Sequence, residues 1–177
     1  MKINKILFCS LLMIFIFFVS CSRKQQYRSD AEVAQFKEPL IKINKYLIKK
    51  DAEQIADYAK RRKWEMKVSK TGLWHMIYEK GNGRNAKEGK IATIEYNINL
   101  LDGTLCYSSD SLGVKKFKIG QGGVEAGLEE GILLMREGDK ARFILLPHLA
   151  FGLVGDDNKI PRRSTIVYDV KLVNVSN

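Results

Sequence analysis

The segment "VEAGLEEGILLMREGDKARFILLPHLAFG", residues 124–152, changes its hydrophobic period part way along. Its first half carries apolar residues at helical spacing: Val124, Leu128, Ile132 and Met135. Such spacing predicts a short amphipathic helix with one apolar face. The "GD" pair then makes a turn, and "KARFILLP" reads as a strand. The segment therefore predicts a helix followed directly by a strand.

Residues on both sides of this segment alternate between apolar and polar side chains, as half-buried strands do. In "IATIEYNINLL" (91–101) the even positions are apolar, and "TIVYDVKLVNV" (165–175) alternates in the same way. "GLWHMIYEKGNG" (72–83) and "VKKFKIG" (114–120) also read as strands, and Asp102-Gly103 reads as a hairpin turn. One helix among strands predicts an α+β fold, an antiparallel sheet with a single helix laid on it.

The first twenty residues read as an export signal. Two lysines precede an apolar run over 6–19, which is shorter than the roughly 20 residues needed to span a bilayer. Cys21 follows at once, and "FVSC" resembles the lipobox at which bacterial lipoproteins are cleaved and acylated. We expect a lipoprotein signal peptide over 1–20 and lipidation of Cys21. A plainly cleaved signal or an uncleaved anchor is the alternative.

The formal net charge of +10 is concentrated near this signal, because residues 22–90 hold 18 basic and 9 acidic side chains. Basic side chains beside one acyl group favour binding of the protein to a bilayer surface. The alternative is that these basic side chains only form the solvated faces of helices. Export and the lack of a nucleic-acid motif argue against nucleic acid as a partner. We expect a membrane-anchored lipoprotein facing the periplasm. Ser22 after Cys21 favours the outer membrane over the inner one.

A tether over 21–28 leads into a helical extension over 29–66. Its apolar residues recur at coiled-coil-like spacings: Val33, Phe36, Leu40, Ile43 and Leu47. Pro39 inside this stripe and a capping pair at Asp51 and Gln54 predict two or three short helices rather than one. The stripe either packs on its own domain or pairs with a second chain to form a homodimer.

The usual catalytic constellations are missing from the sequence. Cys106 is the only thiol left once Cys9 and Cys21 are set aside, so we expect no internal disulfide. His75 and His148 lie far apart without a spaced set of Cys or carboxylate ligands, so we expect no metal site. "GQGGVEAG" matches neither a P-loop nor a dinucleotide fingerprint, and its glycines predict a turn into the helix. No cofactor is expected.

Residues 72–175 resemble the FKBP-type peptidyl-prolyl isomerases. The "GLEEG" helix, the "GDKA" turn, "PHLAFG", "IP" and the final "VYDV" strand fall in the family's order. Together with the lipobox, the chain looks most like FKBP-type lipoproteins of Bacteroidota, such as those associated with gliding motility. The resemblance implies a twisted sheet of five or six antiparallel strands curled round the helix, with an apolar pocket for a proline side chain.

Six residues match the family's pocket positions: Tyr96, Val124, Leu128, Phe151, Ile160 and Tyr168. The resemblance also implies that Ile160 offers its backbone N–H to a substrate carbonyl. Alternating strands bury such residues in any case, so composition alone favours a purely structural core. Only the family pattern assigns catalytic roles to Tyr96, Phe151 and Tyr168, and substrate binding to Val124, Leu128 and Ile160.

The pocket departs from the family's pattern at several positions. Glu125 stands where the family has an apolar residue whose backbone N–H binds substrate, and Tyr107 stands in place of a catalytic aspartate. Cys106 replaces a phenylalanine of the substrate-binding wall, Leu128 a tryptophan and Phe151 a tyrosine. A free cysteine at such a position behaves as a small hydrophobic residue. We expect a working pocket with attenuated activity, since Tyr107 and Phe151 lose polar contacts.

The sequence thus predicts a peptidyl-prolyl cis-trans isomerase that assists the folding of exported proteins. Its partners would be proline-containing peptides and unfolded exported chains. A chaperone or assembly factor that binds proline-containing segments with little or no turnover is the alternative. An accessory protein of motility or secretion machinery is a third interpretation.

Overall fold

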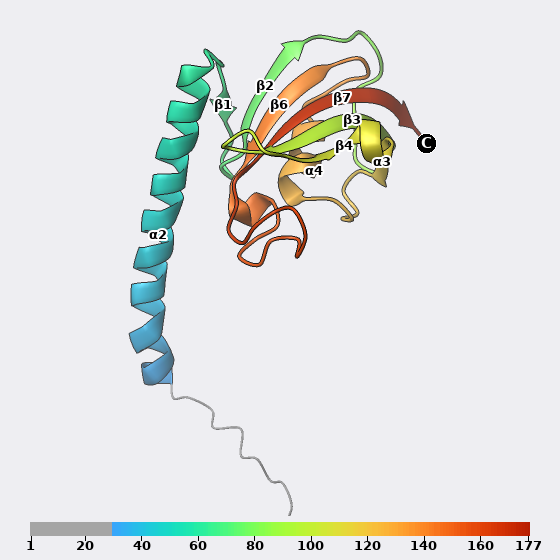
Figure 1. The fold of residues 1–177 in the computed structure, drawn as a ribbon. Coiled ribbons are helices and arrows are strands. Elements are labelled where there is room, and N and C mark those ends of the chain that lie inside the picture. The colour runs from blue at the N-terminus through green and yellow to red at the C-terminus, as the bar shows by residue number, and fades with distance from the viewer. Residues whose placement is uncertain (1–29) are drawn as a thin grey trace, which may run out of the picture. The chain divides into compact units, whose positions relative to one another are not determined.

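The computed structural model describes residues 30–177, so the predicted signal peptide (1–20), Cys21 and the tether (21–28) lie outside the described residues (Figure 1). The chain divides into two compact units between Ile43 and Asn44, and the second unit carries the sheet. The helices are α2 (Asp30–Arg61), α3 (Ser109–Leu112) and α4 (Ala126–Ile132), with a 3-10 turn at Pro147–Leu149. The strands are β1 (Lys67–Val68), β2 (Trp74–Glu79), β3 (Ile91–Leu100), β4 (Leu105–Ser108), β5 (Lys115–Lys118), β6 (Lys140–Leu145) and β7 (Ile166–Ser176).

All seven strands form one antiparallel sheet, which confirms the predicted α+β class. The strand order is β1-β2-β6-β7-β3-β4, and β5 pairs with the opposite end of β3 from β4. The sheet has seven strands where the resemblance implies five or six, and one of the seven is the two-residue β1 at its edge. Gly103 adopts a φ of 94° in the β3–β4 turn, which confirms the predicted hairpin.

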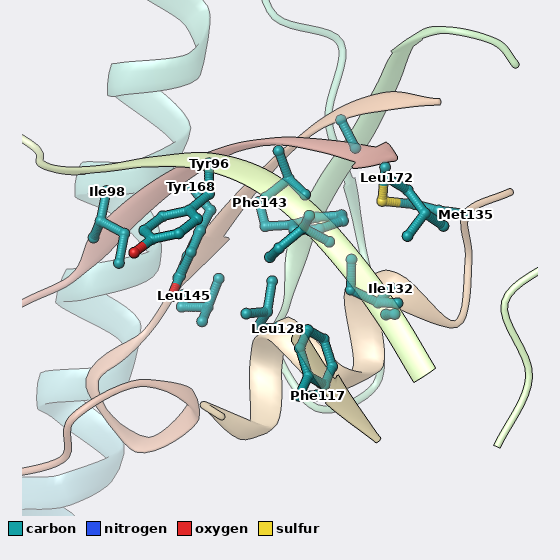
Figure 2. Close-up of a cluster of buried hydrophobic side chains, with 14 of the residues drawn as sticks. Tyr96, Ile98, Phe117, Leu128, Ile132, Met135, Phe143, Leu145, Tyr168 and Leu172 are labelled. Atoms are coloured by element: carbon teal, nitrogen blue, oxygen red, sulfur yellow. The ribbon is translucent and has the colours of Figure 1, made fainter. Parts of the chain in front are cut away.

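Helix α4 lies against one face of the sheet and closes the main core (Figure 2). Leu128 and Ile132 are fully buried, and Figure 2 shows both pointing from α4 toward the strands. Gly127 and Gly131 lie on the same buried side, and a Cβ on Gly131 would lie 2.7 Å from the Phe143 ring. The two glycines therefore let the helix backbone approach the sheet closely.

The opposite face of β6 and β7 carries a second, smaller core. Because strand residues alternate in direction, Ile144 and Val167 point away from α4. They pack against Ile55 and Tyr58 from the last turns of α2, and both of these are buried. The end of α2 therefore belongs to the same folded unit as the sheet.

The helical extension corrects the prediction of two or three short helices. Residues 30–61 form one continuous helix with Pro39 inside it. Asp51 does not cap a new helix, because its carboxylate accepts a hydrogen bond from Arg163 at 2.7 Å in a partly buried ion pair. The Asp51 side chain, which the capping pattern had assigned to a helix start, instead makes a tertiary contact with Arg163. Among residues 30–177, no helix combines the length and apolar character needed to cross a bilayer.

Candidate functional site

A cavity of about 650 Å³ opens on the sheet unit beside the start of α4. Most of the residues that line it are apolar or aromatic, but three of them carry a charge. The lining residues are Tyr96, Ile98, Tyr107, Leu112, Lys115, Gly123, Val124, Glu125, Ala150, Phe151 and Asp156. A concave, mostly apolar site with a few polar groups is the usual form of a small-molecule or peptide site.

Six separate segments converge on this cavity, and one of them is α3, which supplies Leu112. Strand β3 supplies Tyr96, β4 supplies Tyr107, and β5 supplies Lys115. Val124 and Glu125 come from the residues that lead into α4, and Phe151 comes from the loop after the 3-10 turn. Three glycines before α4, at 120, 122 and 123, have φ between 75° and 93°, which confirms the predicted turn into the helix.

The nine residues singled out from the sequence fall into two groups. Five line the cavity: Tyr96, Tyr107, Val124, Glu125 and Phe151. Four lie in the adjoining core with at most 2% of their surface exposed: Cys106, Leu128, Ile160 and Tyr168. The second group therefore supports the walls rather than forming the cavity surface.

Tyr107 is tied to a carboxylate that the sequence reading did not consider. Its hydroxyl donates a short hydrogen bond to Asp156 Oδ2, and Oδ1 of Asp156 accepts the backbone N–H groups of Asn158 (3.0 Å) and Ile160 (2.7 Å). The Ile160 N–H is therefore occupied, contrary to the expectation that it faces a substrate carbonyl. The Tyr107 hydroxyl thus has a polar partner within the protein, whereas the predicted loss of the contacts that the family's aspartate makes stays a prediction.

Glu125 does not stand alone at the cavity wall. Its Oε2 atom accepts a hydrogen bond from the hydroxyl of Tyr168 at 2.9 Å and lies 3.8 Å from Nζ of Lys115. Lys115 Nζ in turn donates to the same Tyr168 hydroxyl at 3.3 Å and lies 5.0 Å from the ring centroid of Tyr96. An ion pair thus joins β5 to the start of α4 across the aromatic base of the site.

Burial and these neighbours shift the titration of the site. Burial, reinforced by the charge and hydrogen bond of Glu125, raises the pKa of Tyr168 well above its ordinary value. Burial likewise raises the pKa of Tyr96, with Glu125 adding to the effect. Burial opposes ionisation of Asp156, but the hydrogen bonds from Tyr107, Ile160 and Asn158 outweigh it and lower its pKa. The tyrosines stay neutral and Asp156 stays ionised at neutral pH.

Sequence reasoning overlooked two charged lining residues, Lys115 and Asp156. A signal for Lys115 was present, since the two-residue period of β5 puts it on the same face as the buried Phe117. Asp156 gave no periodic signal, because it lies in a loop that reaches the cavity only through the folded chain.

The arrangement suits non-covalent chemistry. Within residues 30–177 no cluster of three or more His, Cys, Asp or Glu side chains is arranged to hold a metal ion. Aromatic and aliphatic walls can hold an apolar ring. The Glu125 N–H, which makes no hydrogen bond within the described residues, can donate to a carbonyl.

A twisted antiparallel sheet that holds one short helix, with an aromatic-lined cavity at the helix start, defines an FKBP-type domain. The family model for FKBP-type peptidyl-prolyl cis-trans isomerases matches residues 82–173, which is just over half of the chain. The chain belongs to this family of enzymes.

Curated relatives and solved structures agree with this assignment. The chain is 36% identical over 111 residues to a probable FKBP-type isomerase, FkpA, of Neisseria meningitidis and 33% identical over 110 residues to FkpA of Escherichia coli. Each alignment covers 62% of this chain but only 40% of the relative. The crystal structure of Escherichia coli FkpA matches with a TM-score of 0.62 at 26% identity, covering 94% of this chain and 81% of that one. The crystal structure of AtFKBP13 matches with a TM-score of 0.60 at 30% identity, and the match covers 62% of this chain and 98% of that one.

Proposed function

We propose that this protein is a peptidyl-prolyl cis-trans isomerase that assists the folding of exported proteins. The observation that carries the proposal is the cavity itself, in which Tyr96, Val124 and Phe151 surround a space next to the free N–H of Glu125. Its position within the family-matched segment, residues 82–173, supports the same reaction.

The cavity can lower the rotation barrier without a nucleophile. Rotation about an amide bond faces a barrier of about 18–20 kcal/mol because resonance is lost. A planar amide has more charge separation than a twisted one, so apolar walls disfavour the planar state more than the transition state. The proline ring would lie between Tyr96 and Phe151, and the Glu125 N–H would fix a neighbouring carbonyl. No proton transfer or cofactor takes part.

Exchange spectroscopy by NMR on a panel of Xaa-Pro peptides tests the proposal. Phe151 lacks the hydroxyl that the family's tyrosine offers, so Phe151→Tyr should raise kcat/KM by roughly 2- to 12-fold, the equivalent of one hydrogen bond of about 0.5–1.5 kcal/mol. Leu153→Ala is the matched control, because Leu153 is exposed in the same loop and does not line the cavity. Absence of catalysed exchange in both the wild type and Phe151→Tyr would reject isomerase activity.

The second candidate is a chaperone or assembly factor that binds proline-containing segments with little turnover. The charged pair Lys115–Glu125 favours it, because ions at the base of the site weaken the apolar environment on which rotation depends. Suppressing aggregation of a proline-free client during refolding would support this function.

An accessory role in gliding motility or secretion would appear as a defect of that machinery in a deletion strain.

We also propose that the protein is anchored through an acylated Cys21 and faces the periplasm, in the outer rather than the inner membrane. The support is the lipobox-like "FVSC", the serine that follows Cys21, and the basic residues after it. Cys21→Ser should lose label from a metabolically supplied fatty acid, with Cys9→Ser as the matched control. Label retained on Cys21→Ser would reject lipidation there.

Homodimerisation through residues 29–66 is a further part of the proposal. Leu40 is 64% exposed and Ile43 is 54% exposed among the described residues, and we propose that a second chain covers this part of the apolar stripe. A Leu40→Glu/Ile43→Glu variant of the chain from residue 22 should convert a dimer to a monomer in light scattering. Lys42→Glu serves as the charge control on the same turn. A monomeric wild type would reject pairing.

A further inference from the structure

The charged residues around the cavity differ in how completely the protein satisfies them. The Asp156 carboxylate accepts three hydrogen bonds, from the Tyr107 hydroxyl and from the N–H groups of Asn158 and Ile160. Glu125 accepts the Tyr168 hydroxyl, lies 3.8 Å from Lys115, and keeps only 8% of its side chain exposed. Both carboxylates therefore have hydrogen-bond partners within the protein.

The two ammonium groups are less constrained. Lys115 has three N–H donors; one reaches the Tyr168 hydroxyl at 3.3 Å, and Glu125 at 3.8 Å lies beyond hydrogen-bond distance. Its side chain is 27% exposed, compared with 8% for Glu125, so Lys115 offers more accessible surface to a molecule in the cavity. Lys159 is exposed, with Nζ 5.4 Å from the ring centroid of Tyr107, and forms no ion pair within the described residues.

The cavity therefore offers spare cationic donors and few spare carboxylate acceptors. We propose that Lys115 determines specificity for Xaa-Pro segments in which a residue next to the proline is acidic. A substrate carboxylate would accept the unused N–H donors of Lys115. A basic side chain would meet the same ammonium and would have to displace it to reach Glu125. The inference rests on the proposed function, since it assumes that the cavity binds proline.

The experiment compares three peptides that differ only at the position before proline, with Glu, Gln or Lys there, and a second set varied at the position after it. Dissociation constants come from fluorescence titration, and exchange rates come from NMR. At low ionic strength we expect the Glu peptide of at least one set to bind about three- to tenfold more tightly than the Gln peptide. The Lys peptide should bind most weakly. The Glu preference should shrink in 1 M salt, where the Debye length is about 3 Å.

Variants then locate the preference. Lys115→Met/Glu125→Gln removes both charges without leaving one unpaired, and it should bring the Glu-to-Gln ratio close to one. Lys118→Met is the matched control, because Lys118 lies on the same strand with its side chain exposed and does not line the cavity. It should keep the wild-type ratio. Lys115→Glu/Glu125→Lys places the carboxylate at the more exposed position and should favour the Lys peptide.

A wild-type ratio near one in both peptide sets would overturn the inference, as would a Glu preference that survives in Lys115→Met/Glu125→Gln. If that variant does not fold, the salt dependence of the wild-type ratio decides, since a preference insensitive to salt is not ionic. Failure of the proposed function is distinguishable. Charge-selective binding without catalysed exchange would reject the proposed isomerase activity and support the proposed specificity. Catalysed exchange without charge selectivity would support the isomerase activity and reject the specificity.

Discussion

The core between α4 and the sheet and the cavity at the start of α4 are neighbours, yet they are built differently. The core is apolar throughout, and its glycines bring helix and sheet into close contact. The cavity shares Tyr96 with this core but adds Lys115, Glu125 and Asp156. Burial alone stabilises the first region, whereas the second depends on each charged group having a partner. Substitutions can separate the two.

Tyr168 lies in the core but contacts Lys115 and Glu125 of the cavity wall, so its truncation should have the largest effect. The ring is fully buried in the core, while the hydroxyl donates to Glu125 and accepts from Lys115. Tyr168→Ala should lower the free energy of unfolding by about 3–5 kcal/mol, in the range for removing a large buried aromatic side chain. Tyr168→Phe keeps the ring and should cost only about 1 kcal/mol. Urea denaturation measures both, and equal losses would show that the hydroxyl network, not the packing, dominates.

Gly131→Ala tests the core without touching the cavity. The added Cβ would lie 2.7 Å from two atoms of the Phe143 ring, a distance that forces helix or ring to move. We expect a loss of about 1–3 kcal/mol despite the better helix propensity of alanine. Adding Phe143→Leu to Gly131→Ala should restore part of the lost stability, because both substitutions affect the contact between residue 131 and the side chain at 143. Additive losses in the double variant would contradict a clash at this site.

The same contrast explains what the sequence could and could not predict. Alternation along β3 and β7 and the helical period of α4 predicted the core, because burial imposes those periods on the chain. The family pattern located Tyr96, Val124 and Phe151 at the cavity, which periodicity alone could not separate from core. Tyr107 and Asp156 are paired across 49 residues of sequence, and Lys115 and Glu125 are paired between strand β5 and the residue that precedes α4. Such pairs leave no local period, and for the same reason Asp51 looked like a helix cap.

Asp156 tests the charged part of the cavity, and it also accepts the backbone N–H of the core residue Ile160. Its pKa is lowered in the folded state, so its carboxylate stabilises the fold above the unfolded-state pKa of about 3.9. That contribution is lost as pH falls through the lower, folded-state value. Asp156→Asn should therefore be about 1–2 kcal/mol less stable than the wild type at pH 7.

The two proteins should converge in stability as the pH falls through the folded-state pKa of Asp156, because the wild-type carboxyl then becomes protonated and loses its charge. Chemical denaturation as a function of pH provides the measurement, with Asp157→Asn as the control on the neighbouring exposed residue. A constant difference between the wild type and Asp156→Asn across the pH range would show that the charge of Asp156 contributes nothing.

Cys106 should give the smallest effect, because it lies at the boundary between the two regions but behaves as core. Its side chain is only 2% exposed, and burial, with Asp156 and Asp102 adding to it, raises the pKa of its thiol. The reactive thiolate form of Cys106 is therefore both rare and buried.

In the chain from residue 22, where Cys106 is the only thiol, a thiol reagent should react roughly 100-fold more slowly than with the same chain in denaturant. Cys106→Ala should change stability by about 1 kcal/mol and leave exchange rates within about twofold. Rapid labelling of the folded protein, blocked by a bound proline peptide, would instead place the thiol on the cavity surface.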